Sequence, residues 1–373
     1  MSFFYAGLPI AYGRVKTLTD ASVRECKSDI MEVRPTIMVG VPQVWELIRK
    51  GIATKVEGGS SLKKAVFNAA FKAKSAGIPG LSKLSDSLVF SQVRAQTGGR
   101  LKIMFNGGGP VSQSTQHFLS TALVQMIQGY GLTEGTAMAC ILHPSWMAYN
   151  VVGGPVPGAE VKLVDAPEAG YLSTNTPPQG EIYIRGPSLF KGYYKRPDLD
   201  AEAFDPEGWF KTGDIGQWNA DGTLSIIDRI KNLVKLQGGE YIALEHLESI
   251  YKSVPFVANG CVMADQQHTQ PAMIVVAHPV NLPMFAKKNN LSQSDDLEEL
   301  CKDKKVVDGC LKEMNDVGRK QGLKGMELLE AIVLTDDDWT PESGFLTAAQ
   351  KLQRKTIQEH YKEAINEVYK LSK

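Results

Sequence analysis

The sequence predicts an α/β protein that ends in a smaller α+β part, and three patterns support this class. Residues 36–42 (TIMVGVP) form an apolar run typical of a buried strand, and an amphipathic helical pattern follows over residues 43–56. Short alternating runs separated by turn residues over 152–224 indicate a strand-rich region. An amphipathic helical pattern at 243–253 and an apolar strand at 270–278 then predict a small α+β region.

Composition and charge argue against several classes of protein. Lysine plus arginine equals aspartate plus glutamate at 41 each, so the charge balance gives no reason to expect a nucleic acid as the main partner. The five cysteines lack a CxxC spacing, which argues against a disulfide framework or a zinc site and favours a reducing compartment. No run approaches the roughly 18 apolar residues that a transmembrane helix needs, so any membrane contact is expected to be peripheral.

The most specialised segment spans residues 209–240. Thr212-Gly213-Asp214 is interpreted as a tight turn that presents a carboxylate, and an apolar strand at 224–227 leads into Asp228-Arg229. A carboxylate can hold the two hydroxyls of a ribose, and an arginine on the adjacent strand end can grip the same sugar or a phosphate. The alternative, for each of these elements alone, is a solvated β-meander with ordinary turn residues.

A basic segment punctuated by glycine follows this strand. It ends in Gly238-Gly239-Glu240, and a glycine turn of this kind is able to approach an anionic ligand closely. In the strand-rich region that precedes the segment, Arg185 and the turn at 192–194 (GYY) are interpreted as structural.

Two glycine-rich loops follow the strands predicted at 100–105 and 123–128. The first loop is Asn106-Gly107-Gly108-Gly109-Pro110, and the second covers residues 129–135 (GYGLTEG). Open α/β sheets bind ligands at the carboxyl ends of their strands, and glycines let the backbone come close to a flat ligand or a phosphate. A tight turn from strand to helix is the alternative interpretation of the first loop.

Three side chains of the second loop have functional groups suited to a nucleotide. Tyr130 offers a ring face for stacking on a base, Thr133 a hydroxyl for a phosphate oxygen, and Glu134 a carboxylate suited to Mg²⁺. The alternative is a buried tyrosine, a threonine that caps a helix and a glutamate in its first turn.

With these motifs the sequence resembles the adenylate-forming superfamily, which includes acyl-CoA synthetases, luciferases and peptide-synthetase adenylation domains. The resemblance rests on QGYGLTE at 128–134, NGGGP at 106–110, TGD at 212–214 and DR at 228–229. It implies that Tyr130 stacks on adenine, that Thr133 contacts the α-phosphate, that Glu134 helps to hold Mg²⁺ and that Asp228 is a hinge between domains. The residues it assigns to the nucleotide are Gly107, Gly108, Gly109, Tyr130, Gly131, Thr133, Asp214, Arg229 and Lys351.

Lys351 lies in a basic stretch near the end of the chain and would ordinarily be interpreted as a solvated charge. The resemblance implies that it moves in to touch the substrate carboxylate and the α-phosphate, where an ammonium offsets charge that develops on the adenylyl group. It also implies that rotation about Asp228 replaces Lys351 by the face formed by Gly238, Gly239 and Glu240 when CoA reacts. Lys351, Thr133 and Glu134 are therefore the predicted catalytic residues.

Two long runs look most similar to fungal-type long-chain fatty acyl-CoA synthetases: KLQGGEYIALEHLESIYKS at 235–253 and WTPESGFLTAAQKLQRK at 339–355. This resemblance implies a fatty acid, ATP or AMP, Mg²⁺ and CoA as ligands. It also implies a truncated adenylate-forming fold in three parts. These are the later portion of a large α/β subdomain at 1–150, a small β-barrel subdomain at 151–228 and a mobile C-terminal α+β domain at 229–373.

One family motif, a phosphate loop of the form YTSGTTGxPKG, does not occur in these 373 residues. Two hypotheses follow: a long-chain fatty acid-CoA ligase that activates the acid as an acyl-adenylate, or a catalytically impaired remnant that binds AMP, acyl-CoA or an intact synthetase. The expected location is the cytoplasmic side, with peripheral contact to the endoplasmic reticulum or lipid droplets and self-association left open.

Overall fold

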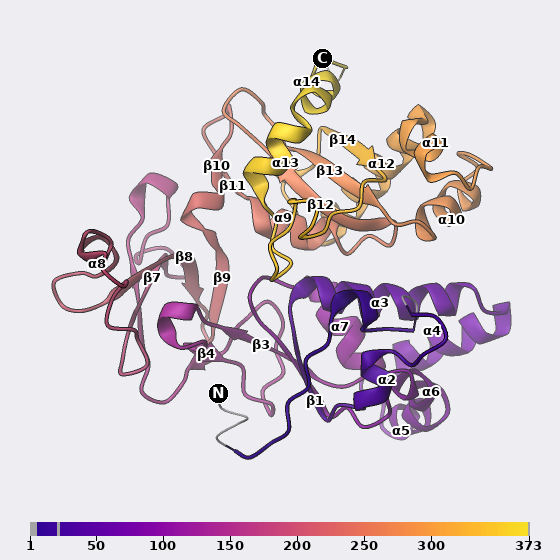
Figure 1. The fold of residues 1–373 in the computed structure, drawn as a ribbon, viewed down its shortest axis with the longest axis horizontal. Coiled ribbons are helices and arrows are strands. Elements are labelled where there is room, and N and C mark those ends of the chain that lie inside the picture. Colours follow the sequence, from indigo (N-terminus) through magenta and orange to yellow (C-terminus); the bar gives the residue numbers. More distant parts are fainter. Residues whose placement is uncertain (1–5, 21–22, 372–373) are drawn as a thin grey trace. The chain divides into compact units, whose positions relative to one another are not determined.

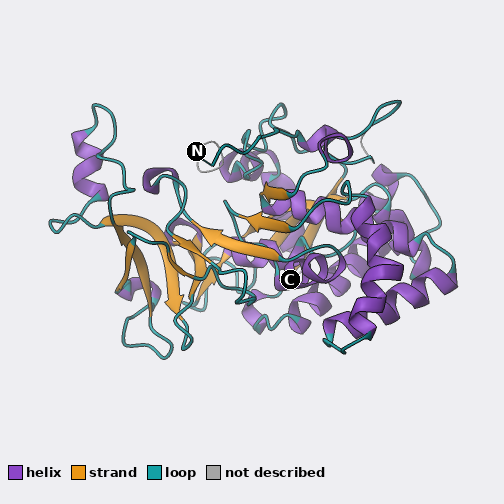
Figure 2. Ribbon diagram, turned by 90° about the horizontal axis from the view of Figure 1, so that it is seen from below, coloured by secondary structure: helices purple, strands orange, loops and turns teal. Residues whose placement is uncertain are grey.

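The computed structural model describes residues 6–20 and 23–371, and helices alternate with strands along most of this length (Figure 1; Figure 2). The chain divides into two units, which are described separately. The first unit comprises Met1–Gly107, Gln113–Ile127 and Pro144–Tyr149, and the second comprises Gly108–Ser112, Gln128–His143 and Asn150–Lys373. The mixture of α/β and α+β structure that the sequence predicts is confirmed.

The first unit combines parallel strands with helices, as the sequence predicts. Strand β1 (Ile37–Gly40) pairs in parallel with β2 (Ile103–Asn106). Helix α3 (Pro42–Glu57) starts with a proline. Proline is favourable there because backbone N–H groups of the first turn have no acceptor within the helix, so its lack of an N–H costs no hydrogen bond. The other elements of the first unit are η1 (Val15–Thr17), α2 (Asp29–Val33), α4 (Ser61–Ser75), α5 (Leu81–Ser85), η2 (Asp86–Phe90), α6 (Ser91–Ala95), α7 (Gln113–Ala122) and the first residues of β3 (Met126–Tyr130).

The expectation that the apolar run at 36–42 is a buried strand is wrong, because no residue of β1 is buried. The strand forms, but Val39 is 61% exposed and Ile37 is 37% exposed. An apolar run without alternation is typical of a strand that is covered on both faces, whereas the described residues cover one face of β1 in part and leave the other exposed.

The strand-rich region of the second unit is an open antiparallel sheet in the order β6-β7-β8-β9. The expected small β-barrel is not closed in the described residues, since these four strands make one open sheet whose edge strands β6 and β9 do not pair. The strands are β6 (Glu160–Val164), β7 (Gln179–Arg185), β8 (Phe210–Trp218) and β9 (Leu224–Arg229). Ile182, Ile184 and Leu224 of this sheet are buried in one cluster with Tyr130 and Cys140.

The C-terminal sheet of this unit consists of β12 (Val257–Met263), β13 (Ala272–Ala277) and β14 (Ala331–Thr335), with β13 in the centre. Strand β13 pairs antiparallel with β12 and in parallel with β14. Every residue of β13 is buried, because side chains pack on both faces of the sheet. The sheet's strongly apolar sequence is what such two-sided burial requires.

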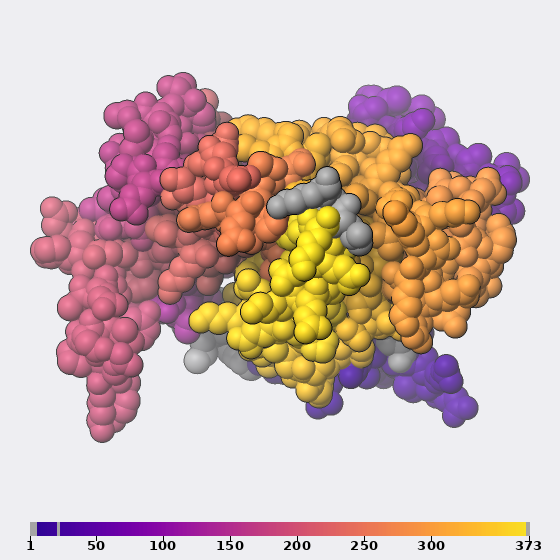
Figure 3. Space-filling view, turned by 90° about the horizontal axis from the view of Figure 1, so that it is seen from above, coloured from indigo at the N-terminus to yellow at the C-terminus, as the bar shows by residue number. Residues whose placement is uncertain are grey.

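Helices account for this burial. Helix α9 (Leu244–Tyr251) buries Leu247 and Tyr251 in the larger cluster, while Ile357 of α13 (Arg354–His360) belongs to the cluster on the other face. Helices α13 and α14 (Lys362–Leu371) are yellow in Figure 3, where they lie against orange segments of the C-terminal region.

The remaining elements of the second unit are mostly short. They are η3 (Thr133–Gly135), β4 (Cys140–Ile141), β5 (Gly154–Pro155), η4 (Pro167–Ala169), α8 (Pro197–Ala203), η5 (Ile230–Asn232), β10 (Leu233–Lys235), β11 (Tyr241–Ala243), α10 (Asn281–Lys288), α11 (Leu297–Lys302), α12 (Lys304–Lys320) and η6 (Gly325–Glu327). Among the helices of the described residues, none is both long and apolar enough to span a membrane.

Replacing Leu247 with alanine is expected to lower the free energy of unfolding by about 2–5 kcal/mol, because Leu247 is fully buried and its removal leaves a cavity. Urea unfolding followed by circular dichroism measures this loss. Val280→Ala, at a side chain that is 49% exposed, is the control and should cost less than about 1 kcal/mol. Equal losses in the two variants would contradict the assignment of Leu247 to the core.

Candidate functional site

A hydrogen bond between Tyr130 and Asp214 lies at the centre of the candidate site. Tyr130 is the last residue of β3, and its hydroxyl donates to Asp214 Oδ2 over 2.6 Å. Both residues are buried, at 9% and 7% exposure. Burial raises the pKa of the Tyr130 hydroxyl, which therefore keeps its proton and remains a donor to the carboxylate.

Arg229 holds the other oxygen of the same carboxylate. It lies opposite Asp214 in the antiparallel pairing of β8 with β9, and its Nε is 3.3 Å from Asp214 Oδ1. The arginine side chain is 56% exposed, so the carboxylate has one buried and one solvent-facing partner. Burial raises the pKa of Asp214, while Tyr130, Arg229 and Lys351 act in the opposite direction.

The interpretation of Thr212-Gly213-Asp214 as a tight turn is wrong, because these residues lie inside β8. The pairing with β7 is irregular between Glu181 and Tyr183, and Gly213 has a φ of 71°. Glycine adopts this angle without strain, so it supports a local bulge in the strand. Glu181 Oε1 accepts a hydrogen bond from the Gly213 N–H (3.1 Å), which fixes the backbone next to Asp214.

Thr133 and Glu134 lie in the short helix η3, where Thr133 is exposed. The N-cap of η3 is Leu132, so the alternative in which Thr133 caps a helix is wrong. Glu134 Oε1 accepts a hydrogen bond from the Tyr193 hydroxyl (2.9 Å), which leaves its carboxylate oriented by a neighbour. Sequence reasoning treated residues 192–194 as structural and missed this contact, because it joins segments 59 residues apart.

Among the predicted glycines, Gly131 has the strictest steric requirement. A Cβ atom at this position would lie 1.6 Å from the carbonyl oxygen of Ala137, so no side chain fits the loop as it is folded. Gly108 has a φ of 80°, and the Gly107 N–H donates to the carbonyl of Gly40 within the first unit (3.2 Å). Gly107 belongs to the first unit, whereas Gly108 and Gly109 belong to the second.

Lys351 lies on a short hairpin of the second unit that spans residues 346–352. The Thr347 N–H donates to the Lys351 carbonyl (2.8 Å), the Lys351 N–H donates to Thr347 Oγ1 (3.1 Å), and Leu346 bridges to Leu352. The Lys351 side chain is exposed, and its charge helps to lower the pKa of Asp214. The contact of Lys351 with a ligand stays a prediction.

Asp228, the predicted hinge residue, is buried at the start of the C-terminal region. Its Oδ2 accepts from the Glu245 N–H in the first turn of α9 (2.8 Å), and its Oδ1 accepts from the Arg229 N–H (2.6 Å) and from Asn232 Nδ2 (3.2 Å). A carboxylate at a helix N-terminus satisfies a free N–H and complements the helix dipole. Burial and the nearby charge of Glu245 nevertheless raise its pKa to about 6.

Gly238, Gly239 and Glu240 form the end of the hairpin between β10 and β11. The Gly239 N–H donates to the Leu236 carbonyl (3.0 Å) and Gly239 has a φ of 92°, so this turn needs a glycine. The described hydrogen bonds of this hairpin do not include the residues around Asp214. Its replacement of Lys351 during a reaction therefore stays a prediction.

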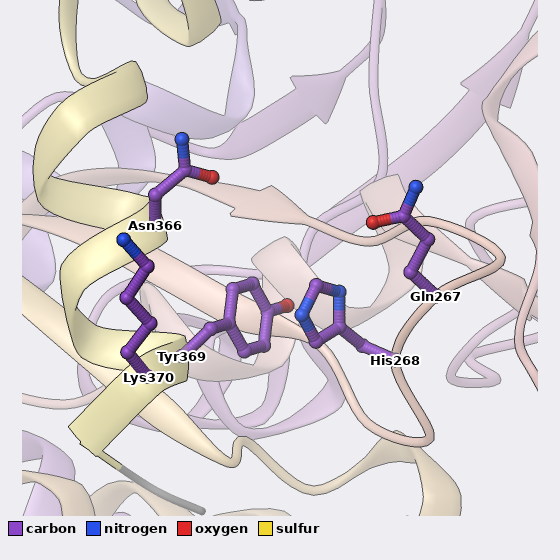
Figure 4. A pocket seen from close by; sticks show the side chains of 5 residues that line it. All are labelled: Gln267, His268, Asn366, Tyr369 and Lys370. Atoms are coloured by element: carbon purple, nitrogen blue, oxygen red, sulfur yellow. The ribbon is translucent and has the colours of Figure 1, made fainter.

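A pocket of about 180 Å³ lies elsewhere in the second unit (Figure 4). Its lining consists of Gln267, His268, Asn366, Tyr369 and Lys370. The His268 ring is stacked on the Tyr369 ring with a centroid separation of 3.6 Å, and His268 Nδ1 is hydrogen bonded to Asp265 (2.8 Å). None of the residues predicted to bind the nucleotide lines this pocket.

The second unit combines a buried carboxylate between a tyrosine and an arginine with a glycine-rich loop and an exposed lysine on a hairpin, which are features typical of nucleotide sites. A family model described as "AMP-binding enzyme" matches residues 1–194, and the chain belongs to this family. The matched segment contains Tyr130 and Glu134, while Asp214, Arg229 and Lys351 follow it.

The curated relatives that the chain matches include fungal long-chain-fatty-acid-CoA ligases. The chain is 44% identical to long-chain-fatty-acid-CoA ligase 1 of Saccharomyces cerevisiae over 99% of its length, which is 53% of that relative. It is 43% identical to long-chain-fatty-acid-CoA ligase 2 of Schizosaccharomyces pombe, covering 99% of this chain and 55% of the relative. The chain thus spans about half the length of the curated relatives it matches.

A solved structure agrees with the fold. The A domain of a carboxylic acid reductase from Segniliparus rugosus, in complex with AMP and a co-purified carboxylic acid, matches with a TM-score of 0.72 and 28% identity. The match covers 92% of this chain and 48% of that one. The fold of the described residues is therefore that of an adenylate-forming enzyme domain.

Charging Asp228 should make the stability of the protein depend on pH. Its pKa of about 6 in the folded protein lies above the ordinary value of 3.8, so the folded state binds the proton more tightly than the unfolded state. Burying the charged carboxylate lowers the free energy of unfolding. This loss is absent below about pH 4, grows as the pH rises and reaches its full value of about 3 kcal/mol above about pH 6.

Urea unfolding of the wild type and of Asp228→Asn between pH 4 and pH 7 tests this expectation, since all other groups titrate in both proteins. The stability of the wild type relative to the variant should fall as the pH rises through this range. A difference that does not change with pH would show that Asp228 keeps its ordinary pKa when folded.

Proposed function

We propose that this chain carries the nucleotide-binding and carboxylate-activating residues of a long-chain fatty acid-CoA ligase. The observation that supports this most directly is the contact of Asp214 with both Tyr130 and Arg229, in a chain that is 44% identical to a long-chain-fatty-acid-CoA ligase. The substrates are then a long-chain fatty acid, ATP and CoA.

In this proposal Asp214 and its two partners, Tyr130 and Arg229, bind the nucleotide. Tyr130 binds Asp214 through its hydroxyl, and we propose that the adenine packs against the small part of this side chain that stays exposed. The ribose hydroxyls donate to Asp214, and Arg229, as the exposed partner, turns outward to the sugar or the α-phosphate. Gly131 and the glycines at 108–109, all of the second unit, keep side chains away from the base.

The chemistry consists of two displacements. A carboxylate oxygen of the fatty acid attacks the α-phosphorus of ATP, the bond to the bridging oxygen breaks, and pyrophosphate leaves with the electron pair. The sulfur of CoA then attacks the acyl carbon, its proton is released, and AMP leaves. The mixed anhydride makes the second step possible because AMP is a good leaving group. Lys351 and Thr133 offset the negative charge that develops around the α-phosphate in the first step.

Glu134 is the residue that fits Mg²⁺. The ion is typically held by one or two carboxylates together with substrate phosphates, so a single oriented carboxylate next to a phosphate site suffices. Tyr193 holds Glu134 Oε1 and thereby fixes the direction in which the carboxylate points. Bound Mg²⁺ would neutralise phosphate charge.

A second candidate function is binding of AMP or acyl-CoA, or association with an intact synthetase, without turnover. The observation in its favour is that this chain spans only 53% of the relative it matches, and no phosphate-loop motif occurs in its sequence. In that case the contacts around Asp214 would bind AMP although no acyl-CoA forms.

The proposed substrate also suggests where the protein works. A long-chain fatty acid partitions into lipid, with about 0.8 kcal/mol gained for each buried methylene, so we propose peripheral contact with a lipid surface. The cytoplasmic face of the endoplasmic reticulum and lipid droplets are the predicted surfaces, and self-association stays a prediction.

Replacing Asp214 with asparagine is expected to weaken AMP binding about tenfold or more, because hydrogen bonds from the ribose to a charged acceptor are lost. Isothermal titration calorimetry with AMP measures this change. Asp221→Asn, at an exposed position in the turn that connects β8 and β9, is the matched control and should bind AMP like the wild type. Equal affinity in all three proteins would place the nucleotide elsewhere.

Formation of oleoyl-CoA from oleate, ATP, Mg²⁺ and CoA tests the proposed activity. Lys351→Ala should reduce the rate about 100-fold or more, because a charge that stabilises the transition state is lost. Lys355→Ala removes an exposed lysine four residues away and serves as the control. AMP binding by folded wild-type protein that forms no oleoyl-CoA would instead support the second candidate function.

A further inference from the structure

Arg354 makes an ion pair inside the second unit that the proposed reaction does not use. It follows Lys351 by three residues and begins helix α13. Its Nη1 donates to Glu248 Oε1 on α9 (2.8 Å) and to the carbonyl of Val262 on β12 (2.8 Å), and it lies 3.1 Å from the sulfur of Cys261. One guanidinium therefore joins α13 to α9 and β12, whose contact residues lie 106 and 92 residues earlier in the chain.

The pair is well shielded from water. The side chain of Glu248 is 5% exposed and that of Arg354 is 24% exposed. Glu248 Oε1 also accepts from the Val262 N–H (2.9 Å), so the carboxylate is bound to β12 as well as to the arginine. Because an isolated buried carboxylate is costly, Glu248 needs a cation in this position, and the arginine is held there in turn.

The Lys351 hairpin is attached to the same region on its other side. The Gln353 N–H donates to the Phe345 carbonyl (2.8 Å), and Phe345 and Leu346 pack in the cluster that contains Cys261 and Ile357. The base of the hairpin is thus apolar and buried, whereas Lys351 itself is exposed at its end.

We propose that Arg354 is a positioning residue for Lys351: it fastens the Lys351 hairpin to helix α9 and strand β12, so that the lysine and α9 move as one body. The assignment rests on the proposed function, in which Lys351 meets the α-phosphate. Since Asp228 holds the first turn of α9, its contacts and those of Arg354 join residue 228 to Lys351 through a single helix.

The attachment has a chemical consequence for the two half-reactions. Displacing a catalytic group by about 1 Å can cost about 100-fold in rate, so a loose hairpin should slow the step in which Lys351 takes part. The attack of CoA on a supplied acyl-adenylate does not use Lys351 in the proposed mechanism and should be little affected.

Amide hydrogen exchange tests the attachment independently of any activity. In Arg354→Met, residues 346–353 should exchange about tenfold faster or more than in the wild type, while β13 keeps its protection. Lys355→Ala removes the same charge from the neighbouring residue and should leave exchange unchanged. If Arg354→Met does not fold, Arg354→Lys keeps the charge without the planar guanidinium and should show a smaller increase in the same residues.

Rates of the half-reactions provide the second readout. Formation of oleoyl-adenylate should fall about tenfold or more in Arg354→Met, while transfer of the acyl group from supplied oleoyl-adenylate to CoA changes less than about twofold. Unchanged exchange in the hairpin, or an equal fall in both half-reactions, would overturn the proposal. A wild-type protein that forms no adenylate would refute the proposed function, and hydrogen exchange would still decide whether Arg354 fastens the hairpin.

Discussion

The second unit depends on one electrostatic constraint: a carboxylate that is removed from water must find its partners within the protein. Moving such a group into the interior costs several kcal/mol unless hydrogen bonds or opposite charges replace the lost water. Asp214, Asp228 and Glu248 are all less than 10% exposed, and each is satisfied by another segment. Tyr130 reaches Asp214 across 84 residues of sequence, and Arg354 reaches Glu248 across 106.

These buried groups serve different ends. Asp214 keeps one partner in the interior, Tyr130, and one at the surface, Arg229, and in the proposed site the ribose would exchange with Arg229 while Tyr130 holds the carboxylate. Asp228 instead binds the first turn of α9 through a backbone N–H, and Glu248, a residue of α9, binds the guanidinium of Arg354. The same kind of group therefore provides a binding surface in one place and a mechanical connection in another.

Local patterns in the sequence account for most elements of the fold. The apolar period predicts α3 and α9, and apolar runs predict β2 and β13 close to their observed bounds. The sequence predicts a turn where the structure has a bulge at Gly213. A glycine beside polar residues is typical of tight turns and of strand bulges, so composition does not distinguish them. The β-barrel was implied by the resemblance to the family, because the strand pattern alone does not reveal whether edge strands pair.

Local motifs predict some residues of the candidate site, whereas its long-range contacts become visible only in the structure. Tyr130, Glu134, Asp214 and Lys351 could be named from motifs, since each lies in a short segment with a recognisable composition. The contacts of Tyr193 with Glu134 and of Arg354 with Glu248 could not, because neither member of these pairs has a local signal that points to the other. Such contacts arise from tertiary packing and become visible only when the chain is folded.

The parallel pairing of β13 with β14 has a consequence for how the chain is made. β12 and β13 are adjacent in sequence and can pair as soon as both have left the ribosome. At a synthesis rate of about 5–20 residues per second, the roughly fifty residues between β13 and β14 delay the second pairing by several seconds. During that interval one edge of the most apolar strand in the C-terminal sheet has no partner, and a nascent chain in this state is a natural substrate for chaperones.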